Sequence, residues 1–146
     1  MADVVDTATR SRMMAGIRGR DTAPELALRR ALHRAGLRFR VHAKELPGRP
    51  DIVLPRWRAV VQVHGCFWHR HLGCKFATSP ATRPEFWTAK FASNVERDAR
   101  NHAALRALGW RTATVWECAL ARGEAADTAE RLADWIRGDG EELEIG

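Results

Sequence analysis

The sequence lacks the features that mark several classes of protein. Its 146 residues include only three cysteines, an odd number that argues against a closed disulfide framework. No run approaches the roughly 18 apolar residues needed to cross a bilayer, and the opening residues MADVVDTATRSR lack the apolar stretch of a signal peptide. No segment recurs, which excludes repeat architectures. We therefore expect a soluble cytoplasmic protein without a membrane partner.

Lysine is also scarce, because Lys44, Lys75 and Lys90 account for only three of the 24 basic residues. The other 21 are arginine, and with 18 acidic residues the formal net charge is +6. A basic chain suits a partner with a negative surface such as nucleic acid, although coding bias also enriches arginine. The basic residues are dispersed along the sequence, which disfavours a single amphipathic helix at a membrane surface.

Hydrophobic periodicity and turn residues predict one α/β domain over residues 21–146, preceded by an arm over residues 1–20. The expected elements are a helix over 22–35, strands over 37–42, 51–54 and 57–63, a helix over 84–108, a strand over 110–117 and a helix over 127–137. The tail after them should fray. This order predicts a mixed central sheet flanked by helices.

Three sites carry the side chains expected at helix starts. Thr22 precedes Glu25 by three residues, the spacing of a capping box, and Gly36 should end that helix. The next helix has the same Thr-x-x-Glu pattern at 82–85, and Asp127 is the expected cap of the last.

The loop after the third strand concentrates potential metal ligands. They are His64, Cys66, His69, His71 and Cys74. Zinc takes thiolate and imidazole ligands in a tetrahedron, so the two cysteines and one histidine could combine with Cys118 at the end of a later strand. Spacing alone does not decide which histidine binds, and those left over remain available for proton transfer near neutral pH. The alternative is that the cysteines are ordinary buried thiols.

Asp51 follows Pro50 at the start of a predicted strand. A Pro-Asp pair followed by Glu-x-Lys at this distance is typical of metal-dependent nucleases, in which the aspartate holds Mg²⁺ against a phosphate. Here Gln62 and His64 stand at the Glu and Lys positions, so the pattern is incomplete. Asp51 could equally be an ordinary turn residue.

Aromatic side chains near these polar groups allow two interpretations. Phe67 and Trp68 stand within the loop, and Trp87 lies near the start of the long helix. Each could be a core residue or a wedge that enters a base stack. Two rows of side chains are expected along that helix. Trp87, Phe91 and Val95 have the spacing of core residues. Lys90, Asn94 and Arg97 form an adjacent row whose polar groups could reach bases or phosphates.

Six separated segments together resemble the very-short-patch-repair (Vsr) mismatch endonucleases. They are ATRSRMMAGIRGRDTAPE, LPGRPDIV, HGCFWHRHLGC, ATRPEFW, NVERD and LGWRTATVWECAL, and the likeness extends from Ala2 to about Gly138. The resemblance implies a restriction-endonuclease-like α/β core with a structural zinc. It also implies Mg²⁺-dependent nicking of double-stranded DNA on the 5′ side of the thymine in a T·G mismatch, as left by deamination of 5-methylcytosine.

The same resemblance implies a role for each matching residue. The zinc ligands correspond to Cys66, His71, Cys74 and Cys118. Asp51 and the backbone carbonyl of Val63 correspond to the magnesium ligands. His69 corresponds to the group that activates or orients water. The catalytic positions around them correspond to His64, Glu25 and Asp98. The residues that match DNA-contacting positions are Met14 with the arm over 1–20, the intercalating Phe67, Trp68 and Trp87, and the base-reading Lys90 and Asn94.

Two departures from the family pattern accompany these matches. Position 63 is Val where Thr is familiar, a change that matters only if a hydroxyl rather than the backbone carbonyl is required. The loop between His71 and Cys74 is one residue longer, and Gly73 should let it absorb the insertion.

Two rival functions remain at this point. One is a zinc-stabilised DNA-binding module without catalysis, and the other is a nuclease of the same fold that cuts unmismatched DNA. We expect a nucleoid-associated monomer, because no exposed apolar helix stands out, with other repair proteins as candidate partners.

Overall fold

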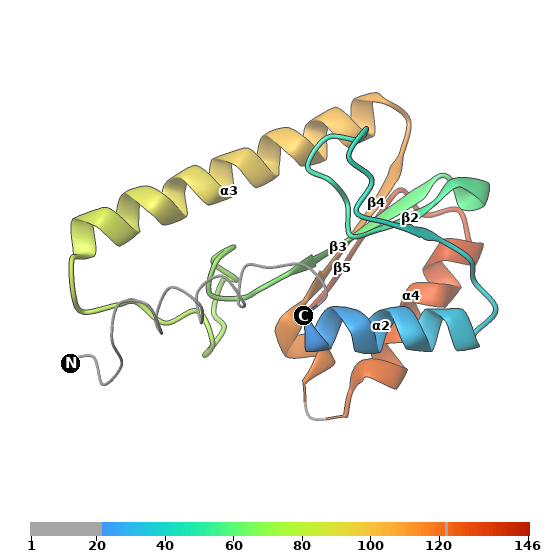
Figure 1. The fold of residues 1–146 in the computed structure, drawn as a ribbon, viewed down its shortest axis with the longest axis horizontal. Helices are drawn as coiled ribbons and strands as arrows, with labels where there is room; N and C mark the ends of the chain where they lie inside the picture. Colours follow the sequence, from blue (N-terminus) through green and yellow to red (C-terminus); the bar gives the residue numbers. More distant parts are fainter. Residues whose placement is uncertain (1–21, 122) are drawn as a thin grey trace.

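The structure, a computed structural model, describes residues 22–121 and 123–146 (Figure 1). The arm predicted over residues 1–20, including Met14, lies outside these described residues. None of the helices in the described ranges is long and apolar enough to cross a membrane.

The described residues form a mixed sheet with three α-helices, as predicted, but the sheet has five strands where four were expected. Its strands are β1 (Arg40–Val41), β2 (Ile52–Leu54), β3 (Ala59–His64), β4 (Arg111–Trp116) and β5 (Glu142–Ile145), in the spatial order β1-β2-β3-β4-β5. The first three strands pair antiparallel, whereas β3, β4 and β5 pair in parallel. Each parallel connection contains a helix, because neighbouring parallel strands need a crossover.

The helices are α2 (Ala23–Arg34), α3 (Pro84–Ala107) and α4 (Ala125–Arg137). Figure 1 shows α2 and α4 together on one face of the sheet and α3 on the other. The main core lies under α2 and α4, where Leu32 and Ile136 are fully buried. A smaller cluster on the opposite face joins Leu105 of α3 to Val53 and Val60. Alternate residues of β2 and β3 therefore face two different cores, which explains their continuous apolar sequence.

The start of α2 is confirmed, but the other two predicted caps are wrong. Thr22 Oγ1 accepts a hydrogen bond from the Glu25 backbone N–H at 3.4 Å, and Gly36 follows the helix with φ of +93°. In contrast, α3 begins after Arg83, without a side-chain cap. Helix α4 begins at Ala125 after Glu124, so Asp127 lies in its first turn, where a negative charge suits the helix dipole.

Two predicted strands are shorter than expected. The segment over 37–42 contributes only β1, because the Leu37 N–H still bonds to the carbonyl of Leu32 and His42 has φ of +49°. The strand predicted from Trp57 begins at Ala59, since residues 55–57 form a 3₁₀ helix, η1 (Pro55–Trp57), and Arg58 is left-handed.

The tail predicted to fray forms a strand instead. β5 pairs in parallel with β4, and its Leu143 and Ile145 pack against the main core. The alternation of Glu and apolar residues in ELEI is a strand pattern, and burial of its apolar side chains stabilises the pairing.

Candidate active site

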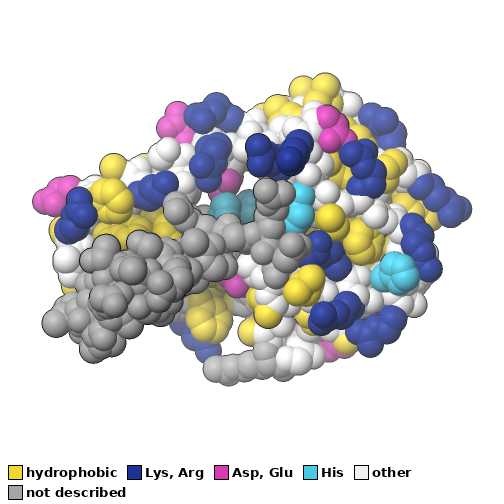
Figure 2. Space-filling view, in the orientation of Figure 1, with side chains coloured by type: hydrophobic (Ala, Val, Ile, Leu, Met, Phe, Trp, Pro, Cys, Tyr) yellow, Lys and Arg dark blue, Asp and Glu magenta, His cyan; other side chains and the backbone are white. Residues whose placement is uncertain are grey.

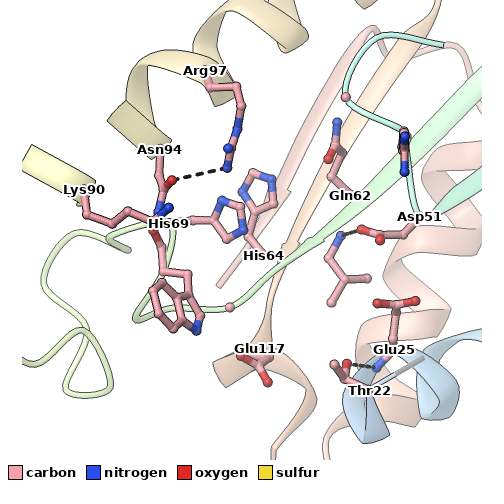
Figure 3. Close-up of a pocket in the computed structure, with 15 residues that line it drawn as sticks. Thr22, Glu25, Asp51, Gln62, His64, His69, Lys90, Asn94, Arg97 and Glu117 are labelled. Atoms are coloured by element: carbon pink, nitrogen blue, oxygen red, sulfur yellow. Dashed lines mark hydrogen bonds between the residues drawn. The ribbon is translucent and has the colours of Figure 1, made fainter. Parts of the chain in front are cut away.

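A pocket of about 280 Å³ opens where β2 begins and β3 ends (Figure 3). Asp51 stands immediately before β2, and its Oδ2 accepts a hydrogen bond of 2.6 Å from the backbone N–H of Val63 in β3. Antiparallel pairing of β2 with β3 brings these two residues together although they are 12 positions apart. The predicted magnesium ligand thus lies at the pocket wall, with one carboxylate oxygen fixed by the sheet.

A second carboxylate and an imidazole lie beside Asp51. Glu25 of α2 is 4% exposed, and its Oε2 is 3.3 Å from His42 Nε2. The other nitrogen of that imidazole, Nδ1, is 3.8 Å from Asp51 Oδ1. His42 therefore lies between the two acids, and these three side chains form a group able to hold a metal ion.

Burial raises the pKa of the Asp51 carboxyl to about 7. The Val63 N–H opposes this rise by stabilising the charged form, whereas the negative charge of Glu25 adds to it. A cation beside these two acids would compensate their charge.

Two stacked imidazoles form the opposite wall of the pocket. The rings of His64, at the end of β3, and His69 have centroids 4.0 Å apart and lie within 6° of parallel. His69 Nδ1 is 2.5 Å from Asp98 Oδ2 of α3, so this ring nitrogen is engaged within the protein while His69 lines the pocket. Burial lowers the pKa of His64 to about 3, with nearby His69 as a second cause, which keeps His64 neutral near neutral pH.

The polar row of α3 lines the same pocket, as Figure 3 shows. Asn94 is 5% exposed; its Nδ2 donates to the carbonyl of Trp68 at 3.2 Å and its Oδ1 accepts from Arg97 at 3.3 Å. The Asn94 amide is thus engaged within the protein. Lys90 and the exposed Arg97 add positive charge at the rim.

Basic side chains continue beyond the pocket. Figure 2 shows Lys and Arg distributed over much of the visible face, among fewer acidic groups. Such a surface favours contact with a polyanion.

The aromatic residues gather under the N-terminal half of α3. Phe67, Trp68, Trp87 and Phe91 contact one another with ring centroids 5.0–5.7 Å apart. Trp68 is 5% exposed and Phe91 8%, whereas Val95, predicted as part of the same core row, is 46% exposed. In this state Trp68 is a core residue, and Val95 is not.

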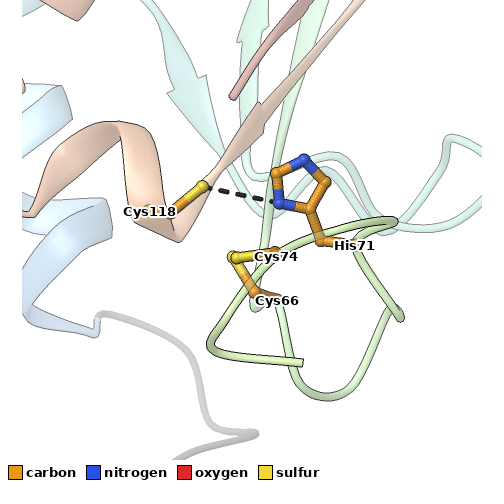
Figure 4. A group of neighbouring side chains, drawn as sticks. All are labelled: Cys66, His71, Cys74 and Cys118. Atoms are coloured by element: carbon orange, nitrogen blue, oxygen red, sulfur yellow. Dashed lines mark hydrogen bonds between the residues drawn. The ribbon is translucent and has the colours of Figure 1, made fainter. Parts of the chain in front are cut away.

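A second group of ligand atoms comes from the loop after β3 and from the residue after Glu117 (Figure 4). Cys66, His71, Cys74 and Cys118 bring one sulfur or nitrogen atom each within 4.8 Å of all the others. Of the histidines that spacing left open, the structure brings His71 here, with Nδ1 3.4 Å from Cys118 Sγ. Three thiolates and one imidazole form a donor set typical of structural zinc.

The two residues between His71 and Cys74 do not separate the four side chains. Gly73 has φ of +69° and Leu72 is 93% exposed, so this part of the loop lies at the surface between two members of the cluster.

The sequence interpretation missed two residues of the site. One is His42, which appeared only as a polar position in an expected strand. The other is Glu117, which lines the pocket directly after β4 and whose pKa is raised by burial. A Cβ at Gly65 would lie 2.8 Å from Glu117 Oε2, so glycine permits this approach. The only sequence signal for Glu117 was its position beside Cys118.

Comparisons with known proteins agree with the geometry. Residues 2–75 match the family described as DNA mismatch endonuclease Vsr. The chain is 51% identical to DNA mismatch endonuclease Vsr of Escherichia coli strain K12, over 99% of this chain and 94% of that protein. It is 48% identical to the type II nicking enzyme V.XorIIP of Xanthomonas oryzae pv. oryzae, over 82% of this chain and 88% of that protein. It is 39% identical to the type II nicking enzyme V.NmeAIP of Neisseria meningitidis, over 94% of this chain and 96% of that protein. The chain belongs to the Vsr family of DNA mismatch endonucleases.

Proposed function

We propose that this protein nicks one strand of double-stranded DNA on the 5′ side of the thymine in a T·G mismatch, and that it needs Mg²⁺ to do so. The observation that carries the proposal is one pocket lined by Asp51 on one side and by His69, bonded to Asp98, on the other. Phosphodiester hydrolysis needs both a site for a divalent cation and a group that handles the proton of the attacking water. The names of the relatives, mismatch endonuclease and nicking enzyme, support the same reaction class.

The acidic side of the pocket fits a divalent cation. Asp51 would hold Mg²⁺ together with the backbone carbonyl of Val63, and Glu25 would act through water. When bound, Mg²⁺ polarises the phosphoryl oxygen and neutralises charge that develops in the transition state. Because only a backbone atom is assigned at position 63, the apolar side chain of Val63 is compatible with this arrangement.

His69 would take the proton of the attacking water. The carboxylate of Asp98 at Nδ1 favours the tautomer with the proton on that nitrogen, which leaves Nε2 as the base. As the water oxygen bonds to phosphorus, its proton passes to Nε2 and the bond from phosphorus to the sugar oxygen breaks. The sugar oxygen leaves with the bonding electron pair and takes a proton from solvent water. His64, neutral and stacked on His69, would hold the plane of the reacting ring.

The cluster of Cys66, His71, Cys74 and Cys118 would bind zinc in a structural role. Cys118 belongs to a 3₁₀ helix, η2 (Glu117–Leu120), directly after β4, whereas the other three residues lie in the loop. A metal ion there would attach the loop to the sheet and thereby fix His69, which lies between Cys66 and His71. We assign the mixed sheet with its metal-braced loop to a restriction-endonuclease-like core.

Mismatch recognition would use the aromatic cluster. Phe67, Trp68 and Trp87 are the proposed wedges, and a T·G pair resists unstacking less than a matched pair does. Because Trp68 is buried, its insertion would require the loop to move away from α3. Lys90 and Asn94 would read bases, for which the Asn94 amide would have to leave its bonds to Trp68 and Arg97. Residues 1–20 with Met14 would clasp the other groove, ahead of an endonuclease domain over 21–146.

A nicking assay distinguishes this function from a zinc-stabilised binding module. Labelled duplexes with one T·G pair, or with T·A at the same place, are incubated with and without Mg²⁺. We expect a nicked product from T·G with Mg²⁺ only. Binding of the T·G duplex without cleavage under any divalent cation would support the module instead. Equal cleavage of both duplexes would indicate a nuclease without mismatch specificity.

A further inference from the structure

We propose that Trp116, held by Glu144 of the C-terminal strand, is a positioning residue for the two imidazoles of the active site. The inference rests on the proposed function, in which His69 handles the proton of the attacking water. It gives the strand β5 a part in catalysis, although β5 lies at the sheet edge and does not line the pocket.

One indole connects the cysteine-histidine cluster to the pocket. The ring of Trp116 stacks on His71, with centroids 4.3 Å apart and planes within 9°. The same indole meets His64 edge-on, with centroids 5.2 Å apart and planes at 77°. His64 in turn stacks on His69. Four rings therefore contact one another in series from the cluster to the reacting imidazole.

The backbone places the indole where these contacts require it. Trp116 ends β4 as the register partner of His64 at the end of β3, so the two side chains are adjacent across the parallel pair. Trp116 is 9% exposed, which leaves the ring little room to move.

A single polar contact fixes the rotation of the indole. Its Nε1–H, the only hydrogen-bond donor of the side chain, donates to Glu144 Oε2 at 2.8 Å. Glu144 belongs to β5, where it pairs with Thr114 of β4. Gly146 lets the chain pass close to the ring, because a Cβ there would lie 2.7 Å from the Trp116 Cβ.

The orientation of His69 depends on this series. Asp98 holds one atom of the His69 ring, and an imidazole held at one atom can still tilt about that bond. The stacked face of His64 restricts the tilt, and the edge contact with Trp116 supports His64. Loss of the Glu144 bond should let the indole rotate, so that His64 and then His69 lose their relative alignment.

Variants of β5 and β4 test the proposal in the full-length protein as purified, with its metal content measured. Glu144→Ala removes the acceptor, Glu144→Gln keeps an amide oxygen that accepts the same bond, and Trp116→Phe keeps a stacking ring without the donor. Glu142→Ala is the matched control, because Glu142 lies on the same strand, is exposed and bonds to His102 of α3 rather than to the ring series.

Two measurements are made on each variant. The first is the single-turnover rate constant for nicking, compared with the dissociation constant for the mismatched duplex. The second is the set of ring ¹⁵N–¹H correlation signals of His64 and His69 without DNA. Because small misplacements of reacting groups are costly, we expect Glu144→Ala and Trp116→Phe to slow nicking about tenfold with DNA binding changed less than about twofold. Both variants should shift the signals of both histidines, whereas Glu144→Gln and Glu142→Ala should resemble the wild type.

Three results would overturn the inference. The first is a Glu144→Ala protein that matches Glu142→Ala in both rate and histidine signals. The second is a fall in rate that follows loss of bound metal, and the third is equal loss of rate in Glu144→Ala and Glu144→Gln. If the wild type itself does not nick DNA, the proposed function fails, but the histidine signals still decide whether Glu144 and Trp116 position the two rings.

Discussion

His69 Nδ1 lies 2.5 Å from Asp98 Oδ2, a contact between the cysteine- and histidine-rich loop after β3 and the middle of α3 across 29 positions of sequence. This contact fixes the tautomer and the direction of the imidazole that we propose as the base. It also ties the loop to the helix that carries Lys90 and Asn94, so the elements that we propose for catalysis and for recognition meet at one bond.

Replacement of Asp98 by Asn should slow nicking about 100-fold, because an amide no longer favours the proton on Nδ1 of His69. DNA binding should change little, since Asp98 contributes to the orientation of the base. Rapid-quench measurement of single-turnover nicking, beside a binding titration, checks this. Glu96→Gln is the control, because Glu96 is exposed on the same helix and pairs only with Arg100 among the described residues. A rate of Asp98→Asn within twofold of that control would contradict the assigned role.

Replacement of Asp51 by Ala should abolish nicking and leave binding of the T·G duplex largely intact. The carboxylate is the proposed cation ligand, whereas the aromatic and basic residues supply the contacts to DNA. Fluorescence anisotropy with the mismatched duplex, run beside the nicking assay, separates the two properties. Equal loss of both would show that Asp51 does not have a purely catalytic role.

The buried carboxyl of Asp51 should also make the stability of the protein depend on pH. Its pKa is about 7 in the folded protein, against about 3.9 expected in the unfolded chain. Between these values the folded state keeps a proton that the unfolded state releases, so stability falls as pH rises. The free energy of unfolding is lowered by the full amount above pH 7, and this decrease is about 4 kcal/mol at most.

Asp51→Asn removes this titration, so the variant should be more stable than the wild type at pH 8 and similar to it at pH 4. Urea unfolding at several pH values checks this, in magnesium-free buffer without a chelator so that the zinc proposed for the cysteine-histidine cluster is not stripped. A stability difference that stays constant from pH 4 to pH 8 would contradict burial of the Asp51 charge.

Replacement of Cys118 by Ala should release the bound metal and misfold the loop that carries His69. Cys118 is the only member of the cluster on the sheet side, so its loss detaches the loop. Elemental analysis of the purified variant and its proteolytic susceptibility in the loop check the prediction. A variant that is fully folded, active and free of metal would refute the ligand assignment.

The sequence was sufficient for the parts of the fold that depend on local patterns. Thr22 and Gly36 mark the ends of α2, and the apolar runs of β2 and β3 are evident without any structure. The short β1 could not be foreseen, because its alternation is interrupted by the left-handed conformation of His42. The strand β5 was missed although Leu143 and Ile145 alternate with glutamates, since four residues at a chain end also suit a frayed tail.

The site was only partly visible in the sequence because its groups come together through tertiary contacts. Spacing identified the cysteines and histidines but did not separate His71 from His64 and His69. In the structure His71 stacks on Trp116, whereas His64 meets Trp116 edge-on and stacks on His69. The positions of His42 and Glu117 follow from strand pairing and from close packing at Gly65. No local pattern reports such contacts.

The position of the nick tests the central claim most directly. Each strand of a T·G duplex is labelled at its 5′ end in turn, and the products are separated at nucleotide resolution after incubation with Mg²⁺. The account predicts one nick, on the 5′ side of the mispaired thymine, in that strand alone. An uncut duplex, or cleavage of both strands or of positions unrelated to the mismatch, would contradict it.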